Sequence, residues 1–287
     1  MTWLDDVAIA ARPVIEKKTW MNSVTMELVT TETLSRVIDE CIASDYYGLD
    51  LETTGLDNRV FDGETRHKMV GVCLSPNDDT GYYIPLRHEE GENVAWMTFI
   101  HEFSRLMDSD ARAVLHNAKF DCEFLEFNGT KPLGDWDNPR KWEDTLILAY
   151  LRNSRERNKG LKFLSKRDLD MEMIELKELF PANHVGDLNF ALLDCSWEPC
   201  VWYAASDAIC TRRLYGVLHE EVLKPQKNKL KPQIGIYTLE KKCVVATRWM
   251  ERCRIQIDEQ KVRELIRIGQ REWWAALMEV YDATSEI

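Results

Sequence analysis

The stretch YYGLDLETTG, residues 46–55, decides the fold of this 287-residue chain. Its apolar part, 46–51, has the length and the β-rich composition of a strand. Two further runs of this kind follow, 69–74 (MVGVCL) and 81–86 (GYYIPL), and polar turn segments separate them. Because short strands joined by turns usually pair with their neighbours, this region predicts a meander of three strands.

Strand and helix patterns alternate on both sides of the meander. Apolar residues recur with a period of two in the strands and at helical spacing in the helices. Outside the meander, the predicted elements up to residue 151 are a strand at 24–30, helices at 31–43 and 94–107, a strand at 113–116, and helices at 121–127 and 145–151, the last with Asp144 as its N-cap. This order predicts an α/β domain with a mixed central sheet flanked by helices.

The C-terminal part of the chain is predicted to be helical. A long helix is expected from Ser196, its N-cap, to Val222. The lysine- and proline-rich segment 224–235 cannot continue that helix and has the composition of a linker. Beyond it, an amphipathic helix is expected at 259–281, and another precedes it on an apolar stripe of Ile236, Leu239, Cys243, Ala246 and Met250.

We therefore expect four parts: an N-terminal segment 1–23 without an assigned role, a domain at 24–223, a linker at 224–235 and a helical extension at 236–287. Because two helices alone bury little surface, the extension is expected to pack on the first domain or on another chain.

The composition indicates a soluble globular protein of the cytoplasm. Apolar residues make up 45% of the chain, and a formal net charge of −12 excludes a protein that coats nucleic acid through its overall field. None of the eight cysteines stands in a C-x-x-C pair that would suggest zinc or dithiol chemistry. The chain has neither a signal-peptide pattern nor a run of 18 apolar residues, so no membrane partner is expected.

Two acidic residues stand out in the strand that decides the fold. Asp50 and Glu52 are two positions apart, so both carboxylates point to the same face of the sheet. Buried together they would repel each other unless a divalent cation neutralised them, and such oxygen-rich sites suit Mg²⁺ or Mn²⁺. Taken alone, however, two acids in a strand are more often simply solvated.

Two other elements add acidic residues. Asp121 follows the short strand at 113–116 near the start of a helix, where an acid is also favoured by the helix dipole alone. Tyr203 and Asp207 are four apart on the long helix and therefore lie on one face, beside the apolar stripe. In isolation, the preferred interpretation of this pair is a tyrosine at the edge of the core next to an ordinary surface aspartate.

In combination, the three elements resemble the DEDD exonuclease superfamily in its tyrosine-bearing branch. Asp50-Leu51-Glu52-Thr53-Thr54-Gly55 matches the first motif of that family, Asn117 to Asp121 the second, and Tyr203-x-x-x-Asp207 the third. The resemblance spans about residues 24–222 and implies a ribonuclease H-like fold.

The resemblance also extends past the exonuclease motifs. Residues 239–258 resemble the segment with which family A DNA polymerases leave the exonuclease domain and enter the polymerase domain. The sequence ends at Ile287, before any palm or fingers motif, so nucleotide addition by this chain alone is not expected.

The resemblance implies a metal-dependent 3′-5′ exonuclease that proofreads for a DNA polymerase and releases nucleoside 5′-monophosphates. Asp50, Glu52, Asp121 and Asp207 would hold two divalent cations, Mg²⁺ or Mn²⁺, and Tyr203 would orient the attacking water. The expected substrates are single-stranded DNA 3′ ends or a primer-template. The expected substrate-binding residues are Thr53, Leu56, Asn117, Phe120, Arg155 and Lys162, the last two from a basic cluster at 152–167.

Three functional hypotheses remain open on the sequence. The first is an active proofreading nuclease that works with a separate polymerase chain, as expected of a phage or bacterial replication system. The second is an exonuclease-like module kept chiefly to dock a polymerase through residues 236–287. The third is a free-standing RNase D-like nuclease acting on RNA. The intact carboxylates favour the first hypothesis, and the polymerase-like segment weakens the third.

Overall fold

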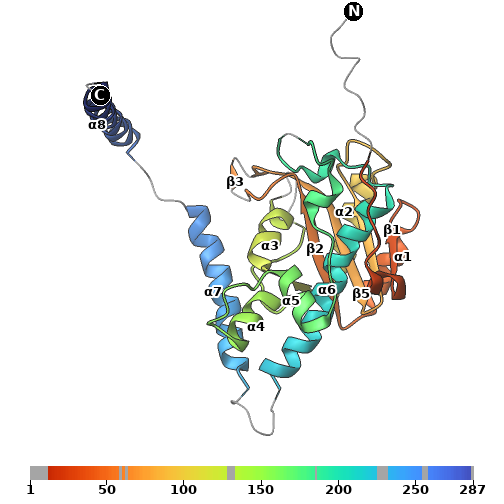
Figure 1. Ribbon diagram of the computed structural model, residues 1–287. Coiled ribbons are helices and arrows are strands. Elements are labelled where there is room, and N and C mark those ends of the chain that lie inside the picture. Colours follow the sequence, from red (N-terminus) through yellow and green to blue (C-terminus); the bar gives the residue numbers. More distant parts are fainter. Residues whose placement is uncertain are drawn as a thin grey trace, which may run out of the picture. The chain divides into compact units, whose positions relative to one another are not determined.

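A six-stranded mixed sheet forms the centre of the protein in a computed structural model (Figure 1). The structure describes residues 12–57, 60–61, 64–127, 133–184, 186–224, 232–253 and 258–285. The sheet order is β1-β6-β5-β2-β7-β8. Its strands are β1 Thr25–Leu28, β2 Tyr46–Thr53, β5 Met69–Asn77, β6 Thr80–Pro85, β7 Arg112–Leu115 and β8 Trp142–Asp144.

The pairing confirms the predicted meander. β2 is antiparallel to β5, and β5 is antiparallel to β6. The other neighbours, β1 on β6, β7 on β2 and β8 on β7, are parallel, so the sheet is mixed as predicted. A small antiparallel pair, β3 Val60–Phe61 with β4 Glu64–Thr65, interrupts the meander between β2 and β5 and was not predicted.

Helices cover both faces of the sheet. The α-helices are α1 Leu34–Ile42, α2 Trp96–Asp108, α3 Ala118–Glu126, α4 Thr145–Arg152, α5 Leu161–Leu169, α6 Glu198–Val222, α7 Ile234–Cys253 and α8 Glu259–Ser285. Three short 3₁₀ helices complete the described elements: η1 Thr19–Ser23, η2 Leu176–Leu179 and η3 Phe190–Leu192.

The alternation of β2 divides its side chains between two cores. Leu49 and Leu51 are buried in the cluster that α1, α2 and α3 form on one face. The other face packs against α6, whose Tyr203 and Ala204 share a second cluster with Cys73 of β5. Asp50 and Glu52 alternate with the two leucines, so they lie on the α6 face.

Two glycines allow α6 to approach the sheet closely (Figure 1). A Cβ at Gly48 of β2 would clash with the carbonyl oxygen of Ala208, and a Cβ at Gly81 of β6 would lie 2.8 Å from the carbonyl oxygen of Ala205. Because these positions lack a side chain, the backbone of α6 lies directly on the strands, which brings residues 203–208 over β2.

The predicted N-cap of α6, Ser196, was wrong by one residue. The helix begins at Glu198, with Trp197 as its N-cap residue and Pro199 in its first turn. Ser196 instead donates its hydroxyl to Asp194 at 2.6 Å. Proline suits the first helical turn because the missing N–H has no intrahelical partner there, and here it outweighs the capping preference of serine.

The N-terminal segment, which had no predicted role, packs on the domain where it is described. Arg12 forms ion pairs of 3.0 Å with both Glu90 and Asp194. Trp20 donates its indole N–H to the carbonyl of Glu172 at 2.7 Å, and Met21 is buried in a core cluster.

The chain forms two compact units, Met1–Arg248 and Trp249–Ile287. The first unit therefore continues past the predicted 224–235 linker, of which residues 225–231 lie outside the described residues. Within α7, the predicted apolar stripe was wrong, since Ile236 and Leu239 are 50% and 58% exposed while Tyr237, Lys241 and Arg248 are buried. Among the described residues, no helix is long and apolar enough to cross a membrane.

Candidate active site

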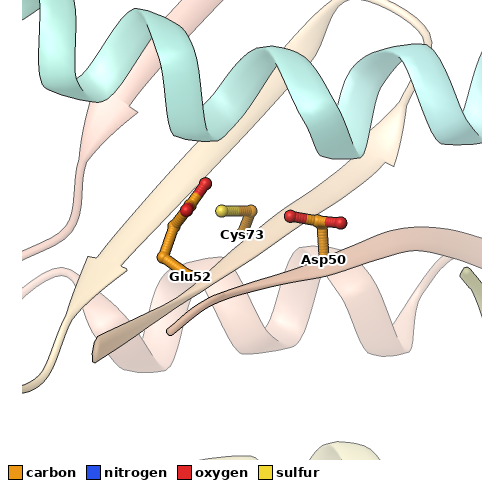
Figure 2. A group of neighbouring side chains, drawn as sticks. All are labelled: Asp50, Glu52 and Cys73. Atoms are coloured by element: carbon orange, nitrogen blue, oxygen red, sulfur yellow. The ribbon is translucent and has the colours of Figure 1, made fainter. Parts of the chain in front are cut away.

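Asp50 and Glu52 project from neighbouring positions of β2 toward α6 (Figure 2). Glu52 is only 7% exposed. Asp50 lies opposite Cys73 in the register of β2 with β5. One ligand atom each from Asp50, Glu52 and Cys73 lies within 4.8 Å of the others, which makes this a candidate metal site.

Asp121 reaches the same region from α3. Its side chain is 3% exposed. The backbone amides of Asp121 itself and of Leu51, which lies between Asp50 and Glu52, lower the pKa of this carboxyl and so oppose part of the rise that burial causes. The preceding Asn117 has φ 74° and ψ 55°, a left-handed conformation that asparagine tolerates better than most residues. This turn brings α3 directly off the end of β7.

α6 contributes Tyr203 and Asp207. Both are buried, with 8% and 9% exposure, so the reading of Asp207 as an ordinary surface residue is wrong. Segments around η3 cover this side of α6, and the rings of Phe190 and Tyr203 lie 5.5 Å apart. The tyrosine and the aspartate are one helical turn apart, on the part of α6 that packs on β2.

The buried carboxylates destabilise one another's charged forms. Burial, followed by the charge of Asp207, raises the pKa of both Asp50 and Glu52 well above the usual range. Burial also raises the pKa of Asp121, with the Asp144 charge as the next cause. For Asp207 itself, burial raises the pKa to about 6. A group of acids with this mutual repulsion has a high affinity for positive charge.

Lys162 is the cation that faces this cluster. Its charge lowers the pKa of Asp50, Glu52 and Asp207 and so opposes part of the repulsion. The ammonium lies 4.6 Å from the centre of the Tyr203 ring and donates to the carbonyl of Ile174 at 2.6 Å. One lysine does not neutralise four carboxylates, so the site remains strongly negative.

Within the described part of the chain, two carboxylate oxygen atoms of the cluster lack hydrogen-bond partners and could therefore bind a metal ion. Glu52 Oε1 and Asp207 Oδ1 are buried and have no hydrogen-bond partner among the described residues. Buried oxygen atoms in native proteins are nearly always paired, so an unpaired carboxylate oxygen here suggests an absent ligand. The four carboxylates of the cluster supply oxygen donors, which Mg²⁺ and Mn²⁺ prefer. The residues present therefore fit divalent cations.

A cleft of about 610 Å³ lies next to Asp207. Its lining residues include Asn158, Lys162, Phe163, Lys166 and Glu175. Phe163 is 39% exposed. An aromatic ring and two ammonium groups beside buried acids offer a stacking surface and charge for a strand of nucleic acid.

The other residues predicted to bind substrate lie at varied positions. Thr53 donates its hydroxyl to the carbonyl of Gly55 at 2.9 Å, and Leu56 is 85% exposed. The Phe120 ring is half-buried and lies 5.0 Å from that of Phe124. Arg155 is exposed in the loop before α5. The side chains of Leu56 and Arg155 are thus free of the core, whereas Phe120 packs on it.

Cys73 also lies at the site and was not predicted from the sequence. The strand 69–74 is apolar at nearly every position, so its alternation does not reveal which side chains face α6. Only the register that sets Asp50 opposite Cys73 identifies it.

The second role of Asp144 was not predicted either. This residue caps α4 as predicted, and its carboxylate additionally accepts from the backbone N–H groups of Asn117 and Ala118 at 3.2 and 2.9 Å.

Comparison with known families agrees with this geometry. A model of the 3′-5′ exonuclease domain of family A DNA polymerases matches residues 26–223. The chain belongs to this 3′-5′ exonuclease family. The match covers every residue of the candidate site, from Asp50 to Asp207.

Related sequences of this exonuclease are DNA polymerases. It is 27% identical over 207 residues to DNA polymerase I of Borreliella burgdorferi, covering 72% of this chain and 21% of the relative. It is 24% identical over 170 residues to the DNA polymerase of Escherichia phage T5, covering 55% of this chain and 19% of the relative. The chain thus spans about a fifth of the length of these relatives.

Solved structures show the same fold for the exonuclease. Trypanosoma brucei RNase D aligns with a TM-score of 0.57 at 16% identity, covering 78% of this chain and 73% of that one. Brucella melitensis NrnC bound to pGG aligns with a TM-score of 0.51 at 20% identity, covering 82% and 98%. The predicted ribonuclease H-like fold with a C-terminal helical extension is confirmed.

Proposed function

We propose that this exonuclease hydrolyses phosphodiester bonds at DNA 3′ ends, releases nucleoside 5′-monophosphates and proofreads for a DNA polymerase. The observation that carries the proposal is the cluster of Asp50, Glu52, Asp121 and Asp207, in which Asp50 is half-buried and the other three are buried, with two carboxylate oxygens that have no partner among the described residues. Strand β2, helix α3 and helix α6 each contribute to it, so the cluster is a property of the fold and not of one local motif.

The four carboxylates would hold two divalent cations, Mg²⁺ or Mn²⁺. When bound, such ions would lower the pKa of a coordinated water and stabilise the charge that develops on the phosphate. The charges of Asp207, Asp121 and Glu52 all act on Asp50, and we propose Asp50 as the ligand that both ions would share. Asp121 would then hold one ion, and Glu52 with Asp207 would hold the other.

Tyr203 would position the attacking water. Burial, followed by the charge of Glu52, raises the pKa of the Tyr203 phenol above its usual range, so the phenol stays protonated near neutral pH. A protonated phenol donates one hydrogen bond and accepts others, which orients a water but does not remove its proton. Lys162 beside the ring would hold that orientation and contact the phosphate backbone of the strand.

The preference for DNA rests on the relatives. Those with matching sequences are DNA polymerases, of which this chain spans about a fifth. The fold shared with Trypanosoma brucei RNase D, at 16% identity, leaves action on RNA as the second candidate. We further propose a separate polymerase chain as partner, in a phage or bacterial cytoplasm, because 239–258 resembles the entry to a polymerase domain.

The test is hydrolysis of 3′-labelled primers, matched and mismatched at the end, with Mg²⁺ and with or without a candidate polymerase. The full chain should shorten single-stranded and mismatched DNA, and the double variant Asp50→Ala/Glu52→Ala should be inactive although folded. An RNA primer of the same sequence compares the two substrates. Undiminished activity of the double variant would remove the proposed site. Faster loss of the RNA primer would favour the RNase D-like alternative, and inactivity of a folded wild-type chain would favour a docking role.

A further inference from the structure

Helix α7 lies outside the matched exonuclease domain, which ends at residue 223, yet it is tied closely to that domain. Its buried residues are Tyr237, Lys241 and Arg248, with 4%, 8% and 1% exposure. Charged side chains are rarely buried unless partners compensate them, so this pattern indicates specific contacts.

Arg248, in the C-terminal half of α7, binds α3. Its guanidinium donates to Glu123 Oε1 at 2.8 Å and to Glu126 Oε2 at 2.6 Å. It also donates to the backbone carbonyl of Cys122, at 3.2 Å, and to that of Trp136, at 3.1 Å. These contacts fix the part of α3 that directly follows Asp121.

Tyr237 and Lys241 hold β8. The Tyr237 hydroxyl accepts from the backbone N–H of Asp144 at 2.8 Å and donates to Glu143 Oε2 at 2.9 Å. Lys241 donates to the same Glu143 oxygen at 3.0 Å, while Arg112 of β7 donates to the other oxygen at 2.5 Å. The position of Asp144 is therefore fixed through its neighbour and its own backbone.

Asp144 carries the effect of α7 to the first turn of α3. Its two carboxylate oxygens accept from the N–H groups of Asn117 and Ala118, which begin that helix. One helix thus fixes α3 at both ends, with Asp121 between them on the buried side.

We propose that α7 is a positioning element of the exonuclease site, in which Arg248 and Tyr237 fix α3 and thereby the carboxylate of Asp121. The inference rests on the proposed function for its catalytic meaning. The hydrogen bonds that Arg248 and Tyr237 form with described residues reach α3, β8 and the segment between them, so the effect should be selective for the Asp121 side of the site. Partners that orient a metal ligand typically change metal affinity by about 10- to 100-fold when they are removed.

The experiment measures Mn²⁺ binding to the full chain by the loss of the free-ion electron paramagnetic resonance signal. Asp121→Asn identifies the ion that depends on Asp121. Tyr237→Phe and Arg248→Met should lower the affinity for that same ion by about tenfold and leave the affinity for the other ion unchanged. Arg105→Met is the matched control, because Arg105 ties α2 to Asp39 of α1 at 2.6 Å, away from α3. It should bind both ions like the wild type.

Hydrogen exchange of residues 118–126 in the metal-free chain gives a second readout. It should be faster in Tyr237→Phe and Arg248→Met and unchanged in Arg105→Met. Wild-type exchange in 118–126 together with wild-type affinity for both ions would overturn the proposal. Equal weakening of both ions would also overturn it, since it indicates general destabilisation.

The experiment also covers a variant that does not fold and a wild-type chain that binds no metal. Arg248→Met removes a buried counter-charge of Glu123, so where it fails to fold, Tyr237→Phe decides. If the wild-type chain neither binds Mn²⁺ nor cleaves DNA, the proposed function fails, while the exchange of 118–126 still decides whether α7 fixes α3.

Discussion

The ammonium of Lys162 lies 4.6 Å from the centre of the Tyr203 ring, at the edge of the cleft that Asp207 also lines. A cation in this position interacts with the face of the ring and with the buried acids at the same time. The positive charge of Lys162 therefore compensates part of the negative charge of the candidate site.

Replacing Lys162 by methionine should shift the activity of the exonuclease toward higher pH. Lys162 lowers the pKa of Asp50, Glu52 and Asp207, so its loss raises the pH at which these groups ionise and bind cations. The measurement is the pH profile of 3′-end hydrolysis. Lys261→Met, which removes an exposed partner of Glu264 on α8, is the control and should keep the wild-type profile. An unshifted profile in Lys162→Met would exclude this electrostatic role.

Tyr203→Phe should slow hydrolysis without abolishing it. Loss of a true acid-base group typically costs about 100-fold or more, and a residue that only orients water should cost less than that. Turnover number and Mn²⁺ binding are measured together. A complete loss of turnover with normal metal binding would show instead that the phenol transfers a proton.

Much of the site follows from local rules in the sequence. The period of two in β2 places Leu49 and Leu51 in one core and Asp50 and Glu52 on the opposite face, and the structure has this arrangement. The three-strand meander and the cap at Asp144 follow from equally local signals.

The contacts of α7 could not be predicted in this way. Helical periodicity assigns an apolar stripe to the core, but α7 also buries Arg248 and Lys241, whose charges Glu123 and Glu143 of the domain compensate. The residues of these two pairs lie 125 and 98 positions apart in the chain, and a periodic pattern contains no information on them. For the same reason the sequence did not reveal how closely Lys162 approaches Tyr203.

Asp144→Ala should destabilise the protein by at least about 2 kcal/mol, because the carboxylate accepts from four backbone N–H groups at the starts of α3 and α4 and a single lost cap typically costs about 1 kcal/mol. Urea denaturation gives the free energy of unfolding. Asp144→Asn keeps one acceptor oxygen and should lose less. Equal stability of Asp144→Ala and the wild type would contradict the double cap.

Asp207→Asn should stabilise the metal-free exonuclease near neutral pH. Folding raises the pKa of Asp207 from 3.8 to about 6, so between these values the folded state binds more protons than the unfolded state. Stability from this group therefore falls as the pH rises through that range, by on the order of 3 kcal/mol in total. Thermal unfolding in chelator should show Asp207→Asn above the wild type at about pH 7.5, with a smaller difference near pH 4. Parallel pH profiles of the two proteins would refute the raised pKa.

Arg155→Ala should weaken the salt dependence of DNA binding. Part of the basic cluster at 152–167 is already compensated, since Arg152 pairs with Asp168 at 2.8 Å, Lys166 with Asp170 at 3.0 Å and Arg167 with Asp168 at 2.6 Å. Among the described residues Arg155 has no such ion pair, and it lies in the loop that also carries Asn158 of the cleft. The slope of log affinity against log salt for a labelled single strand, measured in chelator, should fall by about 0.7 if Arg155 contacts one phosphate. Arg105→Ala on α2 should keep the full slope, and an unchanged slope in Arg155→Ala would place the strand elsewhere.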